Sequence, residues 1–360
     1  MAVCTGTFRS LFLFDLAEEI ALEEVRRILG AGPEAQGAGP KAVTPGYVRF
    51  ERPPVVERAG AIRIAESEPF EARLRYFDAG VVSVELEQRI DTDWDGLVQH
   101  TSRWTGSGEL ESQALALAKE RVQRLSAAIR KPYDEWIVED YHIVHLSDVA
   151  GSPSAERILS QNGEHVAQII RGELFPLSEA ETREVLSSRM SFYPSDLLVV
   201  GWMAALVYET PENVAPLLQL LEYANVQLVG YRRYDYLLGK VLAEAYDASG
   251  HPRNTPGWSW RMNREAEKLN ALRLEVMDLT ERTDNALKFV SDMFYARAFR
   301  MAATRVGVGD YRVIVEDKLK TAGELCEYMV SKYRDARMFV LEALIVLILI
   351  IDLIFLFRGK

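Results

Sequence analysis

The last stretch of the chain restricts its fold more than any other. Residues 338–357 are all Leu, Ile, Val, Phe, Met or Ala, except for Glu342 and Asp352. Twenty residues in an α-helix extend about 30 Å, which matches the hydrocarbon thickness of a bilayer. An apolar surface this wide exceeds the seam of a two-helix coiled coil. The sequence therefore predicts one C-terminal transmembrane helix over 338–357. Its anchoring residues are expected to be Met338, Leu341, Leu344, Leu347, Ile351 and Phe355.

Basic residues flank this run and predict its orientation. Arg334 and Arg337 precede it, and Arg358 follows it. Positive charge concentrates on the cytoplasmic side of membrane spans. We therefore expect a single-pass tail anchor in a lipid bilayer, with the bulk of the chain in the cytoplasm.

The two acids inside the run leave three alternatives open. A carboxylate at membrane depth costs a few kcal/mol unless it is paired, protonated or hydrated. Glu342 lies one turn inside the boundary, near the arginines, whereas Asp352 lies deeper. Ten residues place them about 80° apart around a helix. They are tolerated near the interface, they mark a helix–helix face in an oligomer, or they line an ion or proton path.

The body that precedes this run is acidic. Residues 1–257 contain 25 Lys and Arg against 38 Asp and Glu, whereas residues 258–337 contain 15 against 13. Nucleic-acid binding needs a basic face, so we expect no nucleic-acid partner. Cys4 and Cys326 are too few for a disulfide framework, which favours a reducing compartment.

Residues 1–150 have the pattern of an α+β head domain. Alternating apolar residues over 70–88, around Asp78-Ala79-Gly80, predict two strands joined by a tight turn. Helical spacing that stops at Gly30 predicts a helix over 21–30. The further expected elements are strands over 8–16 and 136–146 and a helix over 109–130. Their order predicts a sandwich-like, mostly antiparallel sheet with helices on one face.

The next hundred residues, 151–250, predict a mixed, mainly helical region packed on the head. The apolar stretch DLLVVGWMAALVY (196–208) reads as a buried strand because it is rich in β-branched residues. A long helix is expected from Pro211 to about Ala248, followed by a linker over 251–257.

Residues 258–337 predict a long antiparallel helical hairpin that forms a stalk. Apolar residues recur at spacings of three and four from Leu269 to Met301, which gives a first arm of about 45 residues from Trp258. Gly307-Val308-Gly309 interrupts this pattern, and a second series follows from Tyr311 to Ala336. This second arm leads into the terminal run without a helix breaker.

Few residues suggest chemistry. His142 and His145 lie three apart on an expected strand and so point to opposite faces, which disfavours a shared metal and favours surface or edge positions. The arginines within 282–305 are expected on a solvated face of the hairpin. The densest polar and aromatic cluster is a possible binding surface, with a helix between sheet and stalk as the simpler account. Its residues are Glu222, Asn225, Tyr231, Tyr234 and Asp235. No catalytic, metal-binding or cofactor-binding residues are assigned.

Residues 272–355 resemble the C-terminal half of the "required for meiotic nuclear division" family, membrane proteins of mitochondria and bacteria. The likeness rests on Asp284, the VEDKL run at 315–319, and Arg337 with Leu341-Glu342 leading into an apolar run that carries a second acid. The resemblance implies a membrane-anchored protein without enzymatic activity, and it carries no catalytic residues across.

These observations favour a tail-anchored cytoplasmic scaffold or interaction protein without a cofactor. The passage from a helical seam into the terminal run suits a homo-oligomer formed through hairpin and terminal helix. The alternatives are an oligomeric ion channel or transporter that uses the terminal helix, or a ligand-binding or enzymatic head. The sequence does not identify a protein partner.

Overall fold

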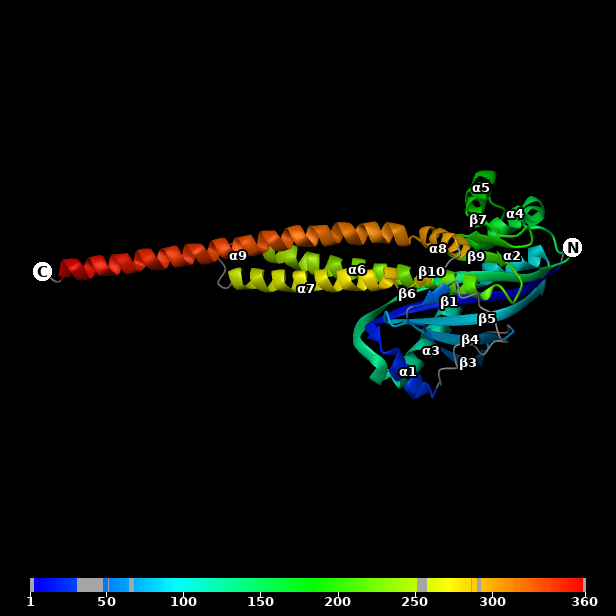
Figure 1. Ribbon diagram of the computed structural model, residues 1–360, viewed down its shortest axis with the longest axis horizontal. Coiled ribbons are helices and arrows are strands. Elements are labelled where there is room, and N and C mark those ends of the chain that lie inside the picture. Colours follow the sequence, from blue (N-terminus) through cyan, green and yellow to red (C-terminus); the bar gives the residue numbers. More distant parts are fainter. Residues whose placement is uncertain are drawn as a thin grey trace. The chain divides into compact units, whose positions relative to one another are not determined.

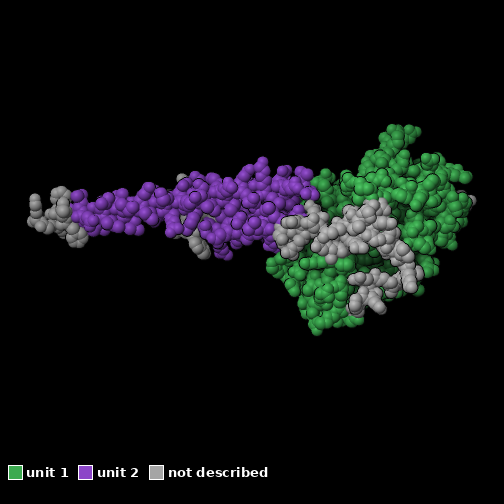
Figure 2. Space-filling view, in the orientation of Figure 1, with its two compact units in different colours: residues 1–233, 282–311 green, residues 234–281, 312–360 purple. Residues whose placement is uncertain are grey.

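The computed structural model describes residues 3–30, 48–50, 52–64, 68–250, 258–285, 287–289 and 293–358 (Figure 1). The chain divides into two compact units (Figure 2). Unit 1 comprises Met1–Arg233 and Arg282–Tyr311, and unit 2 comprises Tyr234–Glu281 and Arg312–Lys360. The chain therefore leaves unit 1, builds part of unit 2, and returns before it leaves again.

Within the described residues, unit 1 contains an eight-stranded mixed sheet in the order β3-β4-β5-β1-β6-β9-β8-β7. Neighbouring strands are antiparallel except β6 and β9, which are parallel. The strands are β1 (Cys4–Ile20), β3 (Val55–Ile62), β4 (Phe70–Tyr76), β5 (Val81–Thr92), β6 (Ile129–Val149), β7 (Arg189–Met190), β8 (Leu197–Val200) and β9 (Ala204–Tyr208). A separate pair joins β2 (Val48–Phe50) to β10 (Leu287–Phe289). The α+β class predicted from the sequence is confirmed.

The hairpin expected over 70–88 is present as β4 and β5. The amide of Phe77 donates to the carbonyl of Val81 at 2.9 Å, and the amide of Gly80 donates to the carbonyl of Phe77 at 3.2 Å. Gly80 has φ +81°, and a Cβ at this position would lie 1.7 Å from the carbonyl oxygen of Ala17. Only glycine combines that backbone conformation with so close an approach to strand β1.

One face of the sheet packs against four helices that follow the strands. These are α1 (Leu22–Leu29), α2 (Trp94–Trp104), α3 (Gly108–Arg124) and α4 (Ala155–Arg171), with α5 (Glu179–Ser187) beside α4. Phe8, Phe12 and Phe14 of β1 alternate toward this core. The helix expected over 109–130 ends earlier, at Arg124, because a short turn over Ser126–Ala128 leads into β6.

The other face of the sheet is covered as well, which corrects the expectation of helices on one face. The first half of helix α6 (Ala215–Gly250) contacts it through Arg75–Glu222, Arg233–Asp15 and Arg232–Glu139 pairs. Strand β1 explains this arrangement, since Leu11 and Leu13 are buried on the face opposite its phenylalanines. A strand whose side chains are apolar on both faces of the sheet needs packing partners on both faces.

The stretch at 196–208 forms two short antiparallel strands, β8 and β9, instead of one strand. Gly201 lies in the turn between them, and its carbonyl accepts a hydrogen bond from the Tyr141 hydroxyl at 3.2 Å. Helix α6 begins at Ala215, four residues after the expected Pro211. The linker expected over 251–257 lies outside the described residues.

Unit 2 packs three helical segments in its described part, which corrects the two-helix hairpin expected over 258–337. The segments come from α6 after Tyr234, from α7 (Trp258–Asn285) and from α9 (Val308–Arg358). Their shared core consists of Leu242, Ala245, Ala266, Leu269, Ala322, Leu325 and Met329. The first arm was expected to be a single helix of about 45 residues, but α7 ends at Asn285. Thr283, Asp284 and Asn285 are weak helix formers, which accounts for this end.

A separate helix follows the end of α7. Helix α8 (Met293–Arg305) belongs to unit 1, where its buried residues are Phe294, Ala298 and Ala302. Gly307, with φ +92°, then separates α8 from α9, as the sequence predicted. The second arm does continue unbroken into the terminal run, because α9 extends from Val308 to Arg358.

The large apolar side chains from Met338 to Ile354 on α9 are exposed. Across the described part of the chain, none of the helices combines the length and the apolar character that a bilayer crossing requires.

Candidate functional site

The predicted binding surface on α6 is mostly not a surface. Glu222, Asn225, Tyr231 and Tyr234 are all at most 5% exposed. Asn225 Nδ2 donates to the Leu221 carbonyl at 2.8 Å within the helix. Asp235 is partly exposed and pairs with Lys318 Nζ at 2.6 Å in unit 2. The sequence showed a polar helix face but could not show that the sheet covers it.

Glu222 belongs to a buried group of charges that we call the ionic cluster. Its residues, contributed by β1, β4, β5 and α6, are Arg9, Arg73, Arg75, Glu85, Glu87 and Glu222. Arg75 Nη1 lies 2.5 Å from Glu85 Oε2 and 3.0 Å from Glu222 Oε2. The strand register produces this arrangement, since Arg73 lies directly opposite Glu85 and Ser83 opposite Arg75. The sequence contains a sign of this cluster, because the two strands of the predicted hairpin carry opposite charges at the same spacing. Arg73 and Arg75 lie on one strand, and Glu85 and Glu87 lie on the other.

The two most buried carboxylates of the ionic cluster differ in the number of arginines that balance their negative charge. Glu85 contacts three arginines, whereas Glu222 contacts Arg75. Burial raises the pKa of Glu85, but Arg75, Arg9 and Arg73 outweigh burial and lower that pKa to about 2. Burial also raises the pKa of Glu222, and there Arg75 offsets only part of the effect, while the charge of Glu85 adds to it. Glu222 is therefore the less stabilised anion.

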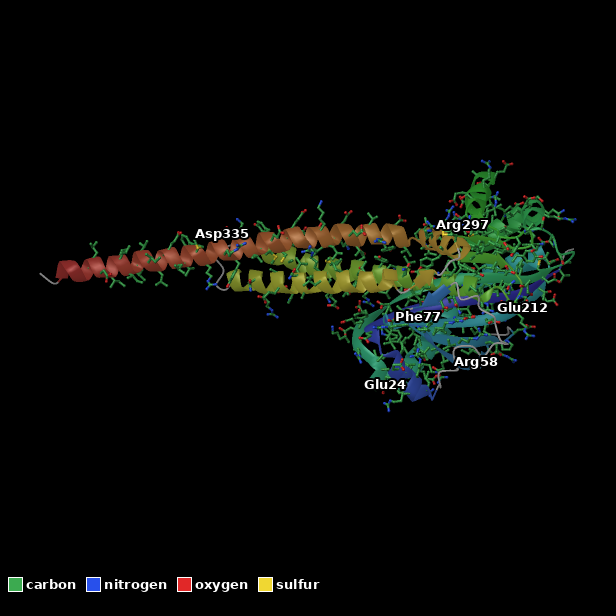
Figure 3. The ribbon with its side chains drawn as sticks, in the orientation of Figure 1. Glu24, Arg58, Phe77, Glu212, Arg297 and Asp335 are labelled. Atoms are coloured by element: carbon green, nitrogen blue, oxygen red, sulfur yellow. The ribbon has the colours of Figure 1, made fainter. Side chains whose placement is uncertain are left out.

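A cavity of about 160 Å³ opens beside this less stabilised carboxylate. Arg75 and Glu222 form its polar side, and Phe77, marked in Figure 3, forms part of its apolar wall. The remaining lining residues are Pro53, Pro54, Val56 and Gln219. A buried charge pair that faces a small cavity with apolar walls has the character of a ligand site.

A second buried ion pair joins Asp15 of β1 to Arg233 of α6. Arg233 Nη2 also donates to the Asp15 carbonyl at 3.0 Å and to the Glu135 carbonyl at 2.8 Å. Its guanidinium carbon lies 4.1 Å from the centre of the Tyr133 ring. Burial raises the pKa of Asp15 to about 7, although Arg233 acts in the opposite direction. This pair fixes α6 on the sheet and faces none of the described cavities.

A family model named "Uncharacterized protein MJ0711, N-terminal domain" matches residues 5–214. The chain belongs to this family. A relative, the uncharacterized protein MJ0711 of Methanocaldococcus jannaschii, is 16% identical over 242 residues, which cover 66% of this chain and 72% of the relative. No solved structure matches the chain.

The match to the MJ0711 family covers the sheet and stops just before α6. It includes every member of the ionic cluster except Glu222. It does not reach residues 272–355, so the resemblance to the meiotic nuclear division family stays a prediction. The family description names no activity, so any role for the cluster has to come from its chemistry.

The MJ0711 domain also contains a serine, a histidine and an aspartate in contact. Ser10 Oγ lies 3.0 Å from His142 Nδ1, and His142 Nε2 lies 3.3 Å from Asp140 Oδ2. Ser10 and His142 are both at most 1% exposed, and Phe8 stacks on the His142 ring. A nucleophile needs access to substrate, so we assign this group to packing of the core.

The histidine pair is buried, which corrects the expectation of surface or edge positions. His145 Nε2 lies 2.8 Å from the Glu209 carbonyl. Strands β1 and β9 lie on either side of β6, so neither histidine is at a sheet edge. Among the described residues, no group of three or more His, Cys, Asp or Glu side chains could hold a metal ion.

The predicted anchoring residues lie together on the last part of α9. Met338, Leu341, Leu344, Leu347 and Ile351 are between 43% and 62% exposed. Glu342, Asp352, Arg334 and Arg337 are exposed on the same helix. The side chains of Phe355 and Arg358 lie outside the described residues.

Proposed function

We propose that this chain is a membrane-attached scaffold or interaction protein without enzymatic activity, whose body lies in the cytoplasm and which assembles as a homo-oligomer. The exposed apolar run on α9 is the observation that carries the proposal. It spans Met338 to Ile354 in the described side chains, and the sequence continues it through Phe355, Leu356 and Phe357.

The run needs a partner on all of its sides. Burial of apolar surface is worth about 25 cal/mol per Å², so a helix that is apolar apart from two acids is strongly disfavoured in water. One neighbouring helix would cover a single stripe and leave the rest exposed. Lipid covers the whole circumference, and the extension to Phe357 gives the run a length of about 30 Å.

Charges at the start of the run support the orientation. Arg334 and Arg337 would lie at the headgroups on the side of the body. Glu342 is close enough in sequence to stay near the same interface. Asp352 has no basic residue near it until Arg358, and a second copy of the helix is a natural partner for it.

Unit 2 offers a further surface for self-association. Leu274 and Met277 on α7 and Val313 and Ile314 on α9 are large apolar side chains that are 42–58% exposed. A second copy of the chain could cover these side chains, and burial of their apolar surface would favour association. The homo-oligomer would use these residues and the terminal helix.

Membrane flotation tests the attachment. The full chain and a variant that ends at Arg337 are mixed with liposomes and centrifuged through a density gradient. We expect the full chain to float with lipid and the shortened variant to remain at the bottom. A full chain that stays soluble and does not float rejects the proposal.

Mass measurement in detergent tests the assembly. Light scattering on the full chain should give a multiple of the 40.7 kDa monomer mass after the detergent is subtracted. A monomer at all concentrations rejects the homo-oligomer but leaves membrane attachment standing.

A ligand-binding head is a second candidate, favoured by the cavity beside Arg75 and Glu222. A thermal-shift screen of small polar compounds tests it, with Glu222→Gln as the variant. A compound that raises the melting temperature of the wild-type chain and not that of the variant would support this role.

A further inference from the structure

Helix α8 is basic, whereas the long stretch of chain before residue 258 has an acidic balance. Met293–Arg305 contains three arginines and no acidic residue, whereas residues 1–257 have 13 more acidic than basic side chains. The sequence predicted a solvated face of a hairpin for these arginines. In the structure α8 belongs to unit 1, and its arginines line a pocket there.

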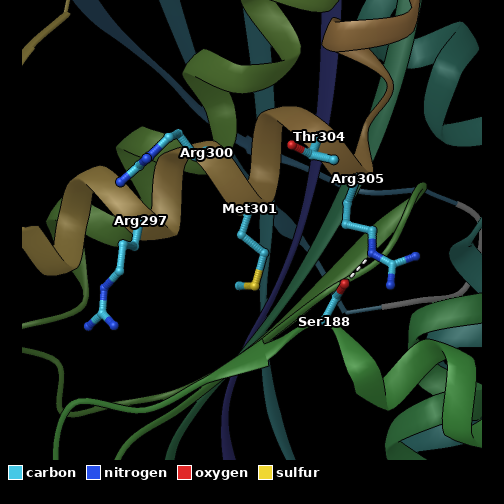
Figure 4. A pocket seen from close by; sticks show the side chains of 6 residues that line it. All are labelled: Ser188, Arg297, Arg300, Met301, Thr304 and Arg305. Atoms are coloured by element: carbon cyan, nitrogen blue, oxygen red, sulfur yellow. Dashed lines mark hydrogen bonds between the residues drawn. The ribbon is translucent and has the colours of Figure 1, made fainter.

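The pocket has a volume of about 430 Å³ and lies between α8 and the segment that leads into β7 (Figure 4). Its lining residues are Ser188, Arg297, Arg300, Met301, Thr304 and Arg305. All of them except Met301 carry hydrogen-bond donors. Nothing in this lining is an acid.

Arg305 is held in place at one end of the pocket. Its Nε donates to Ser188 Oγ, and its Nη2 donates to Ser187 Oγ at 2.8 Å. Its Nη1 lies 2.5 Å from Glu184 Oε1. A guanidinium has five donors, so two remain after these bonds. Because its position is fixed, little entropy is lost when it binds a ligand.

Arg297 and Arg300 have no carboxylate partner among the residues that the structure describes. Arg300 Nε bonds only to the carbonyl of Ala296 at 3.3 Å, one turn earlier. In Figure 4, Arg297, Met301 and Arg305 extend from one side of α8, as expected for residues four apart on a helix. The Cα atoms of Arg297 and Arg305 are thus about 12 Å apart along the axis of α8.

We propose that this pocket binds a ligand that carries a phosphoryl group. Three arginines and the nearby Glu184 leave a local charge of about two positive units. A phosphate monoester carries about −1.5 to −2 at neutral pH, which matches that charge better than a single carboxylate does. Guanidinium groups bind phosphate oxygens in pairs, and the hydroxyls of Ser188 and Thr304 add donors.

The size and composition of the pocket define the ligand further. It exceeds the volume of an inorganic phosphate, and Met301 offers an apolar contact between Arg297 and Arg305. A small organic phosphate and the headgroup of an anionic lipid both have this chemistry. The site does not depend on the membrane attachment proposed above, since its residues all lie in unit 1.

Calorimetry on the full chain in detergent tests the site. One titration uses inorganic pyrophosphate, and another uses dihexanoyl phosphatidic acid with dihexanoyl phosphatidylcholine as its neutral comparison. The test variant is Arg297→Gln with Arg300→Gln, which leaves the Arg305 contacts intact. The matched control is Arg183→Gln, an exposed arginine on α5 in the same unit.

We expect the double variant to weaken phosphoryl binding by at least about tenfold and the control to leave it unchanged. Arg297→Lys with Arg300→Lys should restore part of the affinity, because it keeps the charge and loses the paired donors. Binding of pyrophosphate identifies a soluble phosphate as the source, and binding of phosphatidic acid alone identifies a lipid headgroup. The proposal is overturned if neither probe binds, or if the double variant binds as tightly as the wild-type chain.

Discussion

Arg75 Nη1 lies 3.0 Å from an oxygen of Glu222, which ties strand β4 to helix α6 through two charges inside unit 1. The same nitrogen contacts Glu85, so one guanidinium compensates two buried carboxylates. The match to the MJ0711 family ends before Glu222, and this contact extends the matched domain to the helix that follows it.

The first prediction concerns loss of that guanidinium. Arg75→Leu leaves Glu222 buried without an arginine and removes one of three arginines from Glu85. We expect the free energy of unfolding to fall by about 3–5 kcal/mol, as when one partner of a buried ion pair is removed. Urea unfolding of the full chain measures it. Arg183→Leu, at an exposed arginine, should change stability by less than about 0.5 kcal/mol, and equal effects of the two substitutions would contradict the prediction.

The second prediction concerns acid. Glu85 has a folded-state pKa of about 2, below its ordinary value of 4.5. Because its folded-state pKa is depressed, ionised Glu85 adds about 3 kcal/mol to the free energy of unfolding. This stabilisation is present above pH 4.5 and is lost as the pH falls toward 2. The free energy of unfolding of the wild-type chain, measured by urea unfolding at several pH values, should therefore decrease as the pH is lowered from 4.5 to 2. Glu85→Gln should flatten the curve in the same window, and a variant with an unchanged slope would assign the acid sensitivity to other groups.

The third prediction concerns the turn between β4 and β5. Gly80→Ala places a Cβ 1.7 Å from a backbone oxygen of β1 and imposes a left-handed conformation on alanine. We expect a loss of about 3 kcal/mol or more. Gly106 is the matched control, because it also has a positive φ but meets nothing within 4 Å. Gly106→Ala should cost only about 1–2 kcal/mol. Thermal unfolding of both variants separates the clash from the backbone conformation.

The fourth prediction concerns Asp352. If it pairs with a second copy of the terminal helix, Asp352→Leu should weaken the oligomer in detergent while flotation with liposomes remains. Glu342→Gln, nearer the interface, should leave both measurements unchanged. An oligomer unaffected by Asp352→Leu would remove this residue from the interface. Ion flux in liposomes that depends on Asp352 would favour the channel alternative.

Local patterns predicted much of unit 1. The alternation over 70–88 and the glycine at position 80 were enough for β4, β5 and their turn, because neighbouring residues determine both. The hairpin accounts for part of the ionic cluster, because it brings Arg73 and Arg75 of β4 close to Glu85 of β5. The position of Glu222 could not be derived in this way, since it depends on how α6 packs on the sheet, which no local pattern encodes.

Helix α6 shows that a sequence pattern can predict a helix without predicting which of its faces is buried. Its polar residues were visible in the sequence, and their helical faces followed from their spacing. Glu222 and Tyr231 are buried because α6 packs on the second face of the sheet. That face needs cover because β1 has apolar side chains on both faces of the sheet. The break after Asn285 was missed because apolar spacing continued across it, although Thr283, Asp284 and Asn285 were weak helix formers.

The return of the chain to unit 1 at Arg282 bears on how the protein is made. Unit 1 cannot be complete until Tyr311 has left the ribosome, although its sheet is available after Tyr208. The excursion over 234–281 adds a loop-closure cost of about 3 kcal/mol if it is flexible, and less once α6 and α7 pack together. Pairing of those two helices should therefore precede docking of α8 during synthesis. A chain stalled before residue 293 would expose the part of β8 that α8 contacts.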